Sequence, residues 1–104
     1  MKKLLFIVLV CVTTAAFSQK KLQKLTAAPN PFHTSTTISF TSSESTPVLL
    51  IVKNVLGKTV YQKSFTTTAG KNTLTFYKND LQSGMYIYAI RSRKEVISKR
   101  FVIK

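Results

Sequence analysis

The stretch from Asn79 to Ile90 constrains the fold more than any other part of the sequence. Its first half combines Asn, Asp, Ser and Gly, which favour a sharp turn, and Gly84 can adopt a positive φ at no steric cost. Its second half alternates as a β-strand. The two faces of that strand carry Tyr86, Tyr88 and Ile90 on one side and Met85, Ile87 and Ala89 on the other. Because both faces are apolar, we expect a central strand that is covered on both sides.

The rest of the chain predicts more short strands, separated by turns every eight to twelve residues. The expected strands cover residues 36–40, 47–53, 58–65, 74–76, 85–90 and 95–104, with weaker strand character near Leu25. A hairpin turn is expected at 54–57, with Gly57 at positive φ and Leu56 carried inward. No stretch beyond residue 18 has the 3.6-residue periodicity of a helix. The pattern predicts an all-β fold, an antiparallel β-sandwich of six or seven strands.

The N-terminal residues have the pattern of a secretory signal peptide. Lys2 and Lys3 form a positive head, and an unbroken apolar run follows over residues 4–12. The run is too short to span a bilayer comfortably, so a retained anchor is the less favoured interpretation. Ala16 and Ser18 place small residues at the two positions that a signal peptidase reads.

We therefore expect a cleaved signal peptide over residues 1–18, with the cut between Ser18 and Gln19. Residues 19–28 would then be a short linker, and residues 29–104 would form the β-sandwich domain. Cleavage would remove Cys11, the single cysteine of the chain, so no disulfide is expected in the exported product.

The residues that could support catalysis are few. The chain has one histidine, His33, and three carboxylates, Glu44, Asp80 and Glu95. No serine motif provides a nucleophile with its base, and neither a phosphate-binding loop nor a metal-ligand spacing is present. Asp80 is better explained as a turn residue. We expect a protein that is not an enzyme and that uses neither a metal nor another cofactor.

The chain is strongly basic, with a formal net charge of +13 that falls to +11 when Lys2 and Lys3 are removed. Such a charge attracts anionic partners. The cations are scattered over the whole sequence and match no nucleic-acid-binding motif, so nucleic acid is not an expected partner. Lipopolysaccharide or another acidic surface polymer suits an exported basic domain better, and a solvated basic surface is the simplest interpretation.

Four segments, in a fixed order, resemble a known family. They are Pro29-Asn30-Pro31-Phe32 followed by Thr36-Thr37-Ile38-Ser39-Phe40, then Val48 to Val60 with Asn54 and Gly57, then Asp80-Leu81-Gln82-Ser83-Gly84-Met85-Tyr86, and finally Lys99-Arg100-Phe101-Val102-Ile103-Lys104. Together they resemble the type A C-terminal sorting domain of the type IX (Por) secretion system of Gram-negative bacteria. The resemblance covers about residues 27–104. Lys53 departs from the family pattern, which usually has an aromatic residue before the Asn.

The resemblance implies a seven-stranded Ig-like sandwich that acts as a secretion address. Its implied partners are the type IX outer-membrane translocon and a cell-surface sortase, which attaches cargo to anionic lipopolysaccharide. The implied route runs through the periplasm to the cell surface or the medium. The positions carried over as sorting-motif residues are Pro29, Asn30, Pro31, Phe32, Asn54, Gly57, Asp80, Leu81, Gly84, Tyr86, Lys99, Arg100 and Lys104. The alternative is that the glycines and Tyr86 are needed for folding alone.

Two questions stay open at the level of the sequence. Only the ten residues 19–28 lie between the expected cleavage site and the sandwich, where the family normally carries a long cargo. The chain is therefore either a stand-alone sorting-type domain or the remainder of a longer cargo protein. The alternative function is a small secreted Ig-like adhesion or carbohydrate-binding module.

Overall fold

A computed structural model describes residues 20–104, and the expected signal peptide and its cleavage site lie outside these described residues. The described chain forms seven β-strands. They are β1 (Leu22–Ala28), β2 (Ser35–Ser42), β3 (Pro47–Asn54), β4 (Thr59–Thr66), β5 (Gly70–Tyr77), β6 (Gly84–Arg91) and β7 (Val96–Ile103). No helix in this part of the chain is long and apolar enough to cross a membrane.

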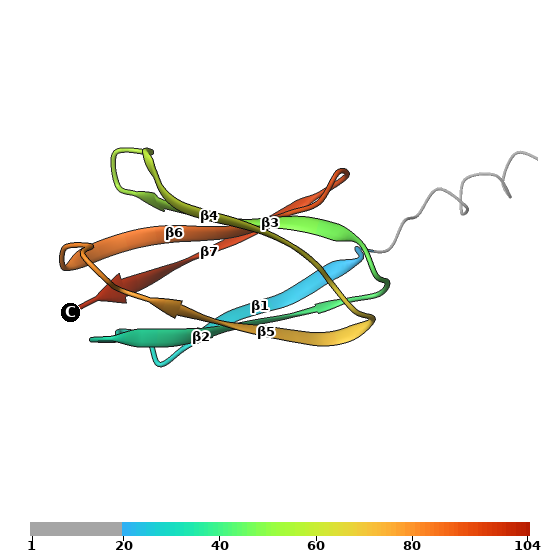
Figure 1. The fold of residues 1–104 in the computed structure, drawn as a ribbon, viewed down its shortest axis with the longest axis horizontal. Coiled ribbons are helices and arrows are strands. Elements are labelled where there is room, and N and C mark those ends of the chain that lie inside the picture. Colours follow the sequence, from blue (N-terminus) through green and yellow to red (C-terminus); the bar gives the residue numbers. More distant parts are fainter. Residues whose placement is uncertain (1–19) are drawn as a thin grey trace, which may run out of the picture.

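The strands form two sheets, each with antiparallel pairing throughout. One has three strands in the order β1-β2-β5, and the other has four in the order β4-β3-β6-β7. Figure 1 shows the sheets as two layers packed face to face. The predicted all-β sandwich is therefore confirmed. Most of the stretch predicted as a linker is strand β1, whose Leu22 and Leu25 are buried in the core.

The strand directions divide the turns between the two ends of the sandwich (Figure 1). The β1–β2, β3–β4 and β5–β6 turns and the C-terminus lie at one end, which we call the motif end. The start of β1 and the β2–β3, β4–β5 and β6–β7 connections lie at the other, which we call the entry end.

The core forms where the period-two alternation of each strand points apolar side chains between the sheets. The inward-facing residues of β2, β3 and β6 are all buried. They are Thr36, Ile38 and Phe40 from β2, Val48, Leu50 and Val52 from β3, and Tyr86, Tyr88 and Ile90 from β6. Phe32 precedes β2 and also enters the core.

Two packing predictions were wrong. Leu56 does not point inward but is 88% exposed at the tip of the β3–β4 turn, because a two-strand turn projects beyond the facing sheet. Strand β6 is central in its sheet, yet it is covered on one side only. Met85 and Ile87 on its outer side are 43% and 39% exposed. The described chain forms only two sheets, so no third layer covers this side.

Candidate functional site

The motif end gathers residues that lie far apart in the sequence. The segment Pro29–Phe32 lies beside the last residues of β7, and the β5–β6 turn leads into Gly84, which pairs with Ile103. Asn54, at the end of β3, pairs with Tyr86 of β6. Segments from the start, the middle and the end of the described chain therefore share one end of the sandwich (Figure 1).

The backbone around Phe32 joins the end of β7 as a short parallel bridge with Ile103. The Phe32 N–H donates to the Val102 carbonyl at 3.0 Å, and the Lys104 N–H donates to the Phe32 carbonyl at 2.8 Å. Strand β7 is one of the two edge strands of its sheet, so these bonds satisfy backbone groups that would otherwise face solvent. The C-terminal segment is thus held by the proline-containing bend.

Asn30 extends this bridge with its side chain. Its Nδ2 donates to the Arg100 carbonyl at 3.2 Å, and its Oδ1 accepts from the Val102 N–H at 3.0 Å. The bend is held from its other side by the Thr36 hydroxyl, which donates to the Pro29 carbonyl at 2.7 Å. The Asn30 side-chain amide takes the place of a neighbouring strand, because its N–H donates and its oxygen accepts at the positions of backbone groups in a β-ladder.

We expect Asn30→Ala to lower the free energy of unfolding by about 1–2 kcal/mol, because it removes two hydrogen bonds worth about 1 kcal/mol each. Amide hydrogen exchange at Val102 should become about 5–30 times faster. Urea denaturation and exchange measured by NMR check both numbers. Asn30→Asp keeps the acceptor for Val102 and loses the donor to Arg100, so exchange at Val102 should rise less. Equal exchange at Val102 in wild type and Asn30→Ala would contradict the assigned bonds.

An aromatic cluster supports the motif end from inside. Phe101 is fully buried and contacts four rings, with centroid distances from 5.0 to 6.2 Å. These rings are Phe32 at 5.1 Å, Phe76 at 5.4 Å, Tyr86 at 6.2 Å and Tyr88 at 5.0 Å. Burial raises the pKa of the Tyr88 phenol above its ordinary value, so this side chain is neutral in the core. The cluster couples the bend, β6 and β7 into one packing unit.

The Asp80–Tyr86 motif builds a structured turn. The Leu81 N–H donates to the Lys78 carbonyl at 3.0 Å, and Gly84 has a φ of +148°. The Tyr86 hydroxyl then donates back to the Gln82 carbonyl at 2.7 Å. Leu81 packs against the core, whereas Asp80 is exposed. The Tyr86 side chain therefore stabilises the β5–β6 turn from the core side.

Asn54 and Gly57 shape the neighbouring β3–β4 turn. The Asn54 Oδ1 accepts from the backbone N–H groups of Leu56 at 2.9 Å and Lys58 at 3.0 Å. Gly57 has a φ of +85°, which confirms the predicted positive value. This geometry explains why Asn and Gly occupy these positions. The Asn54 side chain caps the turn, and Gly57 adopts the positive φ of the turn without steric strain.

The three cations of the C-terminal motif are all exposed, but they face different ways. Lys99 pairs with the buried Tyr88 and so belongs to the inward-facing row of an edge strand. An inward-facing charge at an edge opposes pairing with another strand. Arg100 pairs with Ile87 on the outer face, and Lys104 lies beyond the last strand residue. These residues do not form one cluster.

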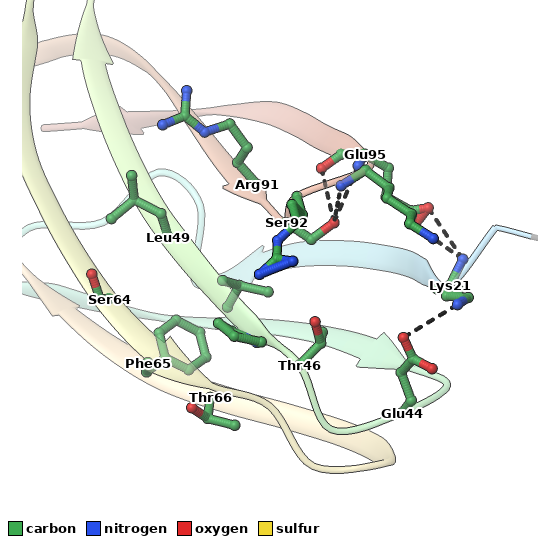
Figure 2. A pocket seen from close by; sticks show the side chains of 14 residues that line it. Lys21, Glu44, Thr46, Leu49, Ser64, Phe65, Thr66, Arg91, Ser92 and Glu95 are labelled. Carbon is green, nitrogen blue, oxygen red and sulfur yellow. Dashed lines mark hydrogen bonds and ion pairs between the residues drawn. The ribbon is translucent and has the colours of Figure 1, made fainter.

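A groove of about 1040 Å³ lies at the entry end, away from the motif residues, none of which lines it. Figure 2 shows Lys21 between two carboxylates. Its Nζ pairs with Glu44 at 3.2 Å, and the Glu95 carboxylate accepts from the backbone N–H groups of Lys21 and Leu22 at 2.8–3.2 Å. The Arg91 side chain extends away from both carboxylates (Figure 2). These acidic residues fix the start of β1. His33 is exposed and lines a separate shallow hollow.

Some contacts that shape this site were not predicted. Thr36, Gln82 and Val102 lie in the segments that carry the resemblance, but the hydroxyl bond of Thr36 and the backbone bonds of Gln82 and Val102 were not expected. Side-chain type carries no signal for such backbone contacts. The exposed outer side of β6 did leave a signal, the second apolar face of that strand, but it was interpreted as a covered face.

Comparisons with known proteins found one family. A model described as "Secretion system C-terminal sorting domain" matches residues 26–104. No curated protein matched the sequence. Among solved structures, the crystal structure of the C-terminal domain of wzt is similar, with 11% sequence identity and a TM-score of 0.44, over 84% of this chain and 74% of that one.

Proposed function

We propose, from the premise that this chain belongs to the C-terminal sorting domains of the type IX (Por) secretion system, that the machinery of that system recognises it as an address for export across the outer membrane. The observation that carries the proposal is the joining of Pro29–Phe32 to the end of β7. Motif segments about 70 residues apart form one end of a folded domain. A receptor can therefore recognise them together only when the domain has folded.

The expected partners and route follow from this role. The domain would cross the inner membrane with a signal peptide, fold in the periplasm and be recognised by the outer-membrane translocon. A cell-surface sortase would then act on it, and cargo would be attached to anionic lipopolysaccharide or released. The basic charge of the chain suits an acidic cell surface.

The proposed Ig-like class is supported by two features of the fold. The seven strands are divided three to four between the sheets, with β3, β6 and β7 adjacent in the larger one. The Tyr86 hydroxyl bonds back to the Gln82 carbonyl across the turn between the sheets. This contact resembles the tyrosine corner of Ig-like sandwiches, where a tyrosine near the start of the sixth strand bonds to backbone a few residues upstream.

We also propose that the domain acts by being recognised and not by catalysis. The three carboxylates of the described chain do not lie together at one site. Glu44 and Glu95 hold the start of β1, and Asp80 lies in a turn at the opposite end. The alternative, an adhesion or carbohydrate-binding module, would be favoured by exposed aromatic platforms. Tyr86 and Tyr88 are instead buried in the core, and Tyr77 is the single exposed aromatic ring of the described residues.

An export assay tests the sorting function. Residues 19–104, fused behind a signal peptide and a fluorescent cargo, should carry the cargo past the outer membrane of a host that has the type IX system. Fluorescence is compared between periplasm, cell surface and medium. Changing Lys99, Arg100 and Lys104 to Gln should lower export several-fold while leaving the urea midpoint unchanged, since all three side chains are exposed.

Deleting residues 99–104 should abolish export, but the deletion also removes Phe101 and Ile103 from the core. The Gln variant separates loss of recognition from loss of folding. Cargo that stays periplasmic behind the intact domain, in a host shown to export its own sorting-domain proteins, would refute the sorting function. The adhesion alternative would then take its place.

A further inference from the structure

The outer faces of the two sheets differ in chemistry. The outer face of the three-stranded sheet is covered largely by hydroxyl side chains. Its rows pair Ser35 with Tyr77, Thr37 with Thr75, Ser39 with Thr73, and Thr41 with Lys71. Such a face is well solvated. The outer face of the four-stranded sheet carries apolar side chains in every row across β3, β6 and β7, interspersed with cations. The outer face of the three-stranded sheet thus has the hydroxyl side chains of a solvated face, whereas the outer face of the four-stranded sheet does not.

We call this second surface the apolar–basic face. The strand register places its residues in adjacent rows, because directly paired residues of antiparallel strands point to the same side. The rows are Leu49–Arg91–Val96, Ile51–Ala89–Ser98, Lys53–Ile87–Arg100 and Met85–Val102. Met85, Ile87 and Val96 are 43%, 39% and 56% exposed. Met85 and Ile87 lie in adjacent rows of β6, and exposed apolar side chains that lie together are a feature of interaction sites.

The charge on this face has one sign. Its ionisable residues are Lys53, Arg91 and Arg100, all exposed. The acidic residues of the described chain lie elsewhere, two at the entry end and one in the β5–β6 turn. Ile87 is flanked in its row by Lys53 and Arg100, whose side chains are longer than its own. The face therefore places apolar side chains beside cationic ones: Ile87 lies between two cations, and Arg91 lies between Leu49 and Val96.

We propose that the apolar–basic face is the surface by which this domain docks onto an acidic protein surface of the secretion machinery, one that presents apolar side chains bordered by carboxylates. The proposal rests on the sorting function above and names the surface that performs it. Carboxylates opposite Lys53, Arg91 and Arg100 would steer and orient the partner, and burial of Met85 and Ile87 would supply affinity.

Two other occupants fit the face less well. A second copy of the chain, related by a two-fold axis, would bring the same cations against each other, which costs affinity. A fluid lipid surface offers no fixed anions opposite Lys53, Arg91 and Arg100. A protein partner can place carboxylates and apolar atoms at fixed positions, as the arrangement of cations around Ile87 requires.

The test measures binding of the purified chain to the purified, detergent-solubilised type IX outer-membrane complex. The variant Met85→Thr/Ile87→Thr should bind at least about tenfold more weakly. Its matched control is Tyr77→Thr, which changes an aromatic residue that is 56% exposed on the outer face of the three-stranded sheet and belongs neither to the apolar–basic face nor to the sorting motif. The control should bind like wild type. Unchanged urea midpoints verify that both variants fold.

A charge pair completes the test. Lys53→Gln/Arg100→Gln should lower the association rate about tenfold at low salt, and the difference should shrink at high salt. Its control is Lys63→Gln/Lys71→Gln, with two exposed lysines outside the face, and it should have a smaller effect.

The outcomes separate this proposal from the sorting function. If wild-type cargo is exported and the Met85/Ile87 variant binds and exports like wild type, the face is refuted and the sorting function survives. If cargo is not exported, the sorting function fails, and absence of binding to the purified complex refutes the face as well. Binding of wild type to phosphatidylglycerol vesicles that the Met85/Ile87 variant loses, with binding to the complex intact, would assign the face to a membrane. A dimer in sedimentation that this variant dissolves would assign it to self-association. Either result overturns the proposal.

Discussion

Replacing Phe101 by alanine should remove about 3–5 kcal/mol of the free energy of unfolding, a large part of the stability that a small domain has. Phe101 is fully buried and contacts four other aromatic rings. Deleting its ring leaves a cavity between the two sheets that the surrounding β-strands cannot close without losing their ladders. Urea denaturation followed by near-UV circular dichroism, which reports the packing of tyrosine rings, measures the loss.

Phe65→Ala is the matched control for this prediction. Phe65 is only half-buried, and its ring contact is with Phe40 at 6.2 Å. The same deletion there should cost clearly less. In the export assay, Phe101→Ala should fail although Lys99, Arg100 and Lys104 are intact, because the bend and β7 would no longer be held together. A loss of stability no larger than that of Phe65→Ala would show that Phe101 is not the centre of the core.

Gly84→Val is expected to lower the free energy of unfolding by about 1–3 kcal/mol. Gly84 begins β6 with a φ of +148°, a region that residues with a Cβ rarely adopt. A Cβ built at Gly84 would meet no other atom within 4 Å, so the cost comes from the backbone conformation and not from a clash. The measurement is the urea midpoint, with the slope of the transition unchanged.

A D-alanine at position 84, introduced by peptide ligation, is the sharpest control. It adds a methyl group, but the allowed φ of a D-residue has the opposite sign, so a φ of +148° is unstrained. D-alanine should therefore retain nearly full stability, whereas L-alanine should lose part of what valine loses. Equal stability of the L- and D-alanine proteins would show that Gly84 is not required for its backbone conformation.

Much of the fold could be predicted because it depends on local patterns. The alternation of Thr36, Ile38 and Phe40 identified a strand and its inward face, and the alternation of Tyr86, Tyr88 and Ile90 identified a second strand. Side chains of a strand alternate between two sides whatever it pairs with, so this information is contained in a few consecutive residues. The same holds for Gly57 and Gly84, where the turn itself demands a positive φ.

The contacts of the candidate site could not be predicted in this way. Asn30 lies 70 and 72 positions from the backbone groups it bonds, and no local pattern selects them. Leu56 is apolar and yet exposed, because the tip of a turn has no facing layer to bury it. Apolar residues on both sides of β6 were interpreted as cover on both sides. The sequence pattern shows which side chains are apolar, but it does not show whether another layer covers them.

The sequence by itself determined that this chain is an all-β sandwich, which side of β2 and β3 forms its core, and where its sharp turns lie, because these follow from the period of the strand and the sterics of single residues. Only the tertiary structure decided that Pro29–Phe32 clamps the end of β7 and that Met85 and Ile87 lie uncovered. Both depend on which surfaces meet when two sheets pack. That is a property of the whole chain, since the free energy of a contact is gained only after the strands on either side of it are in place.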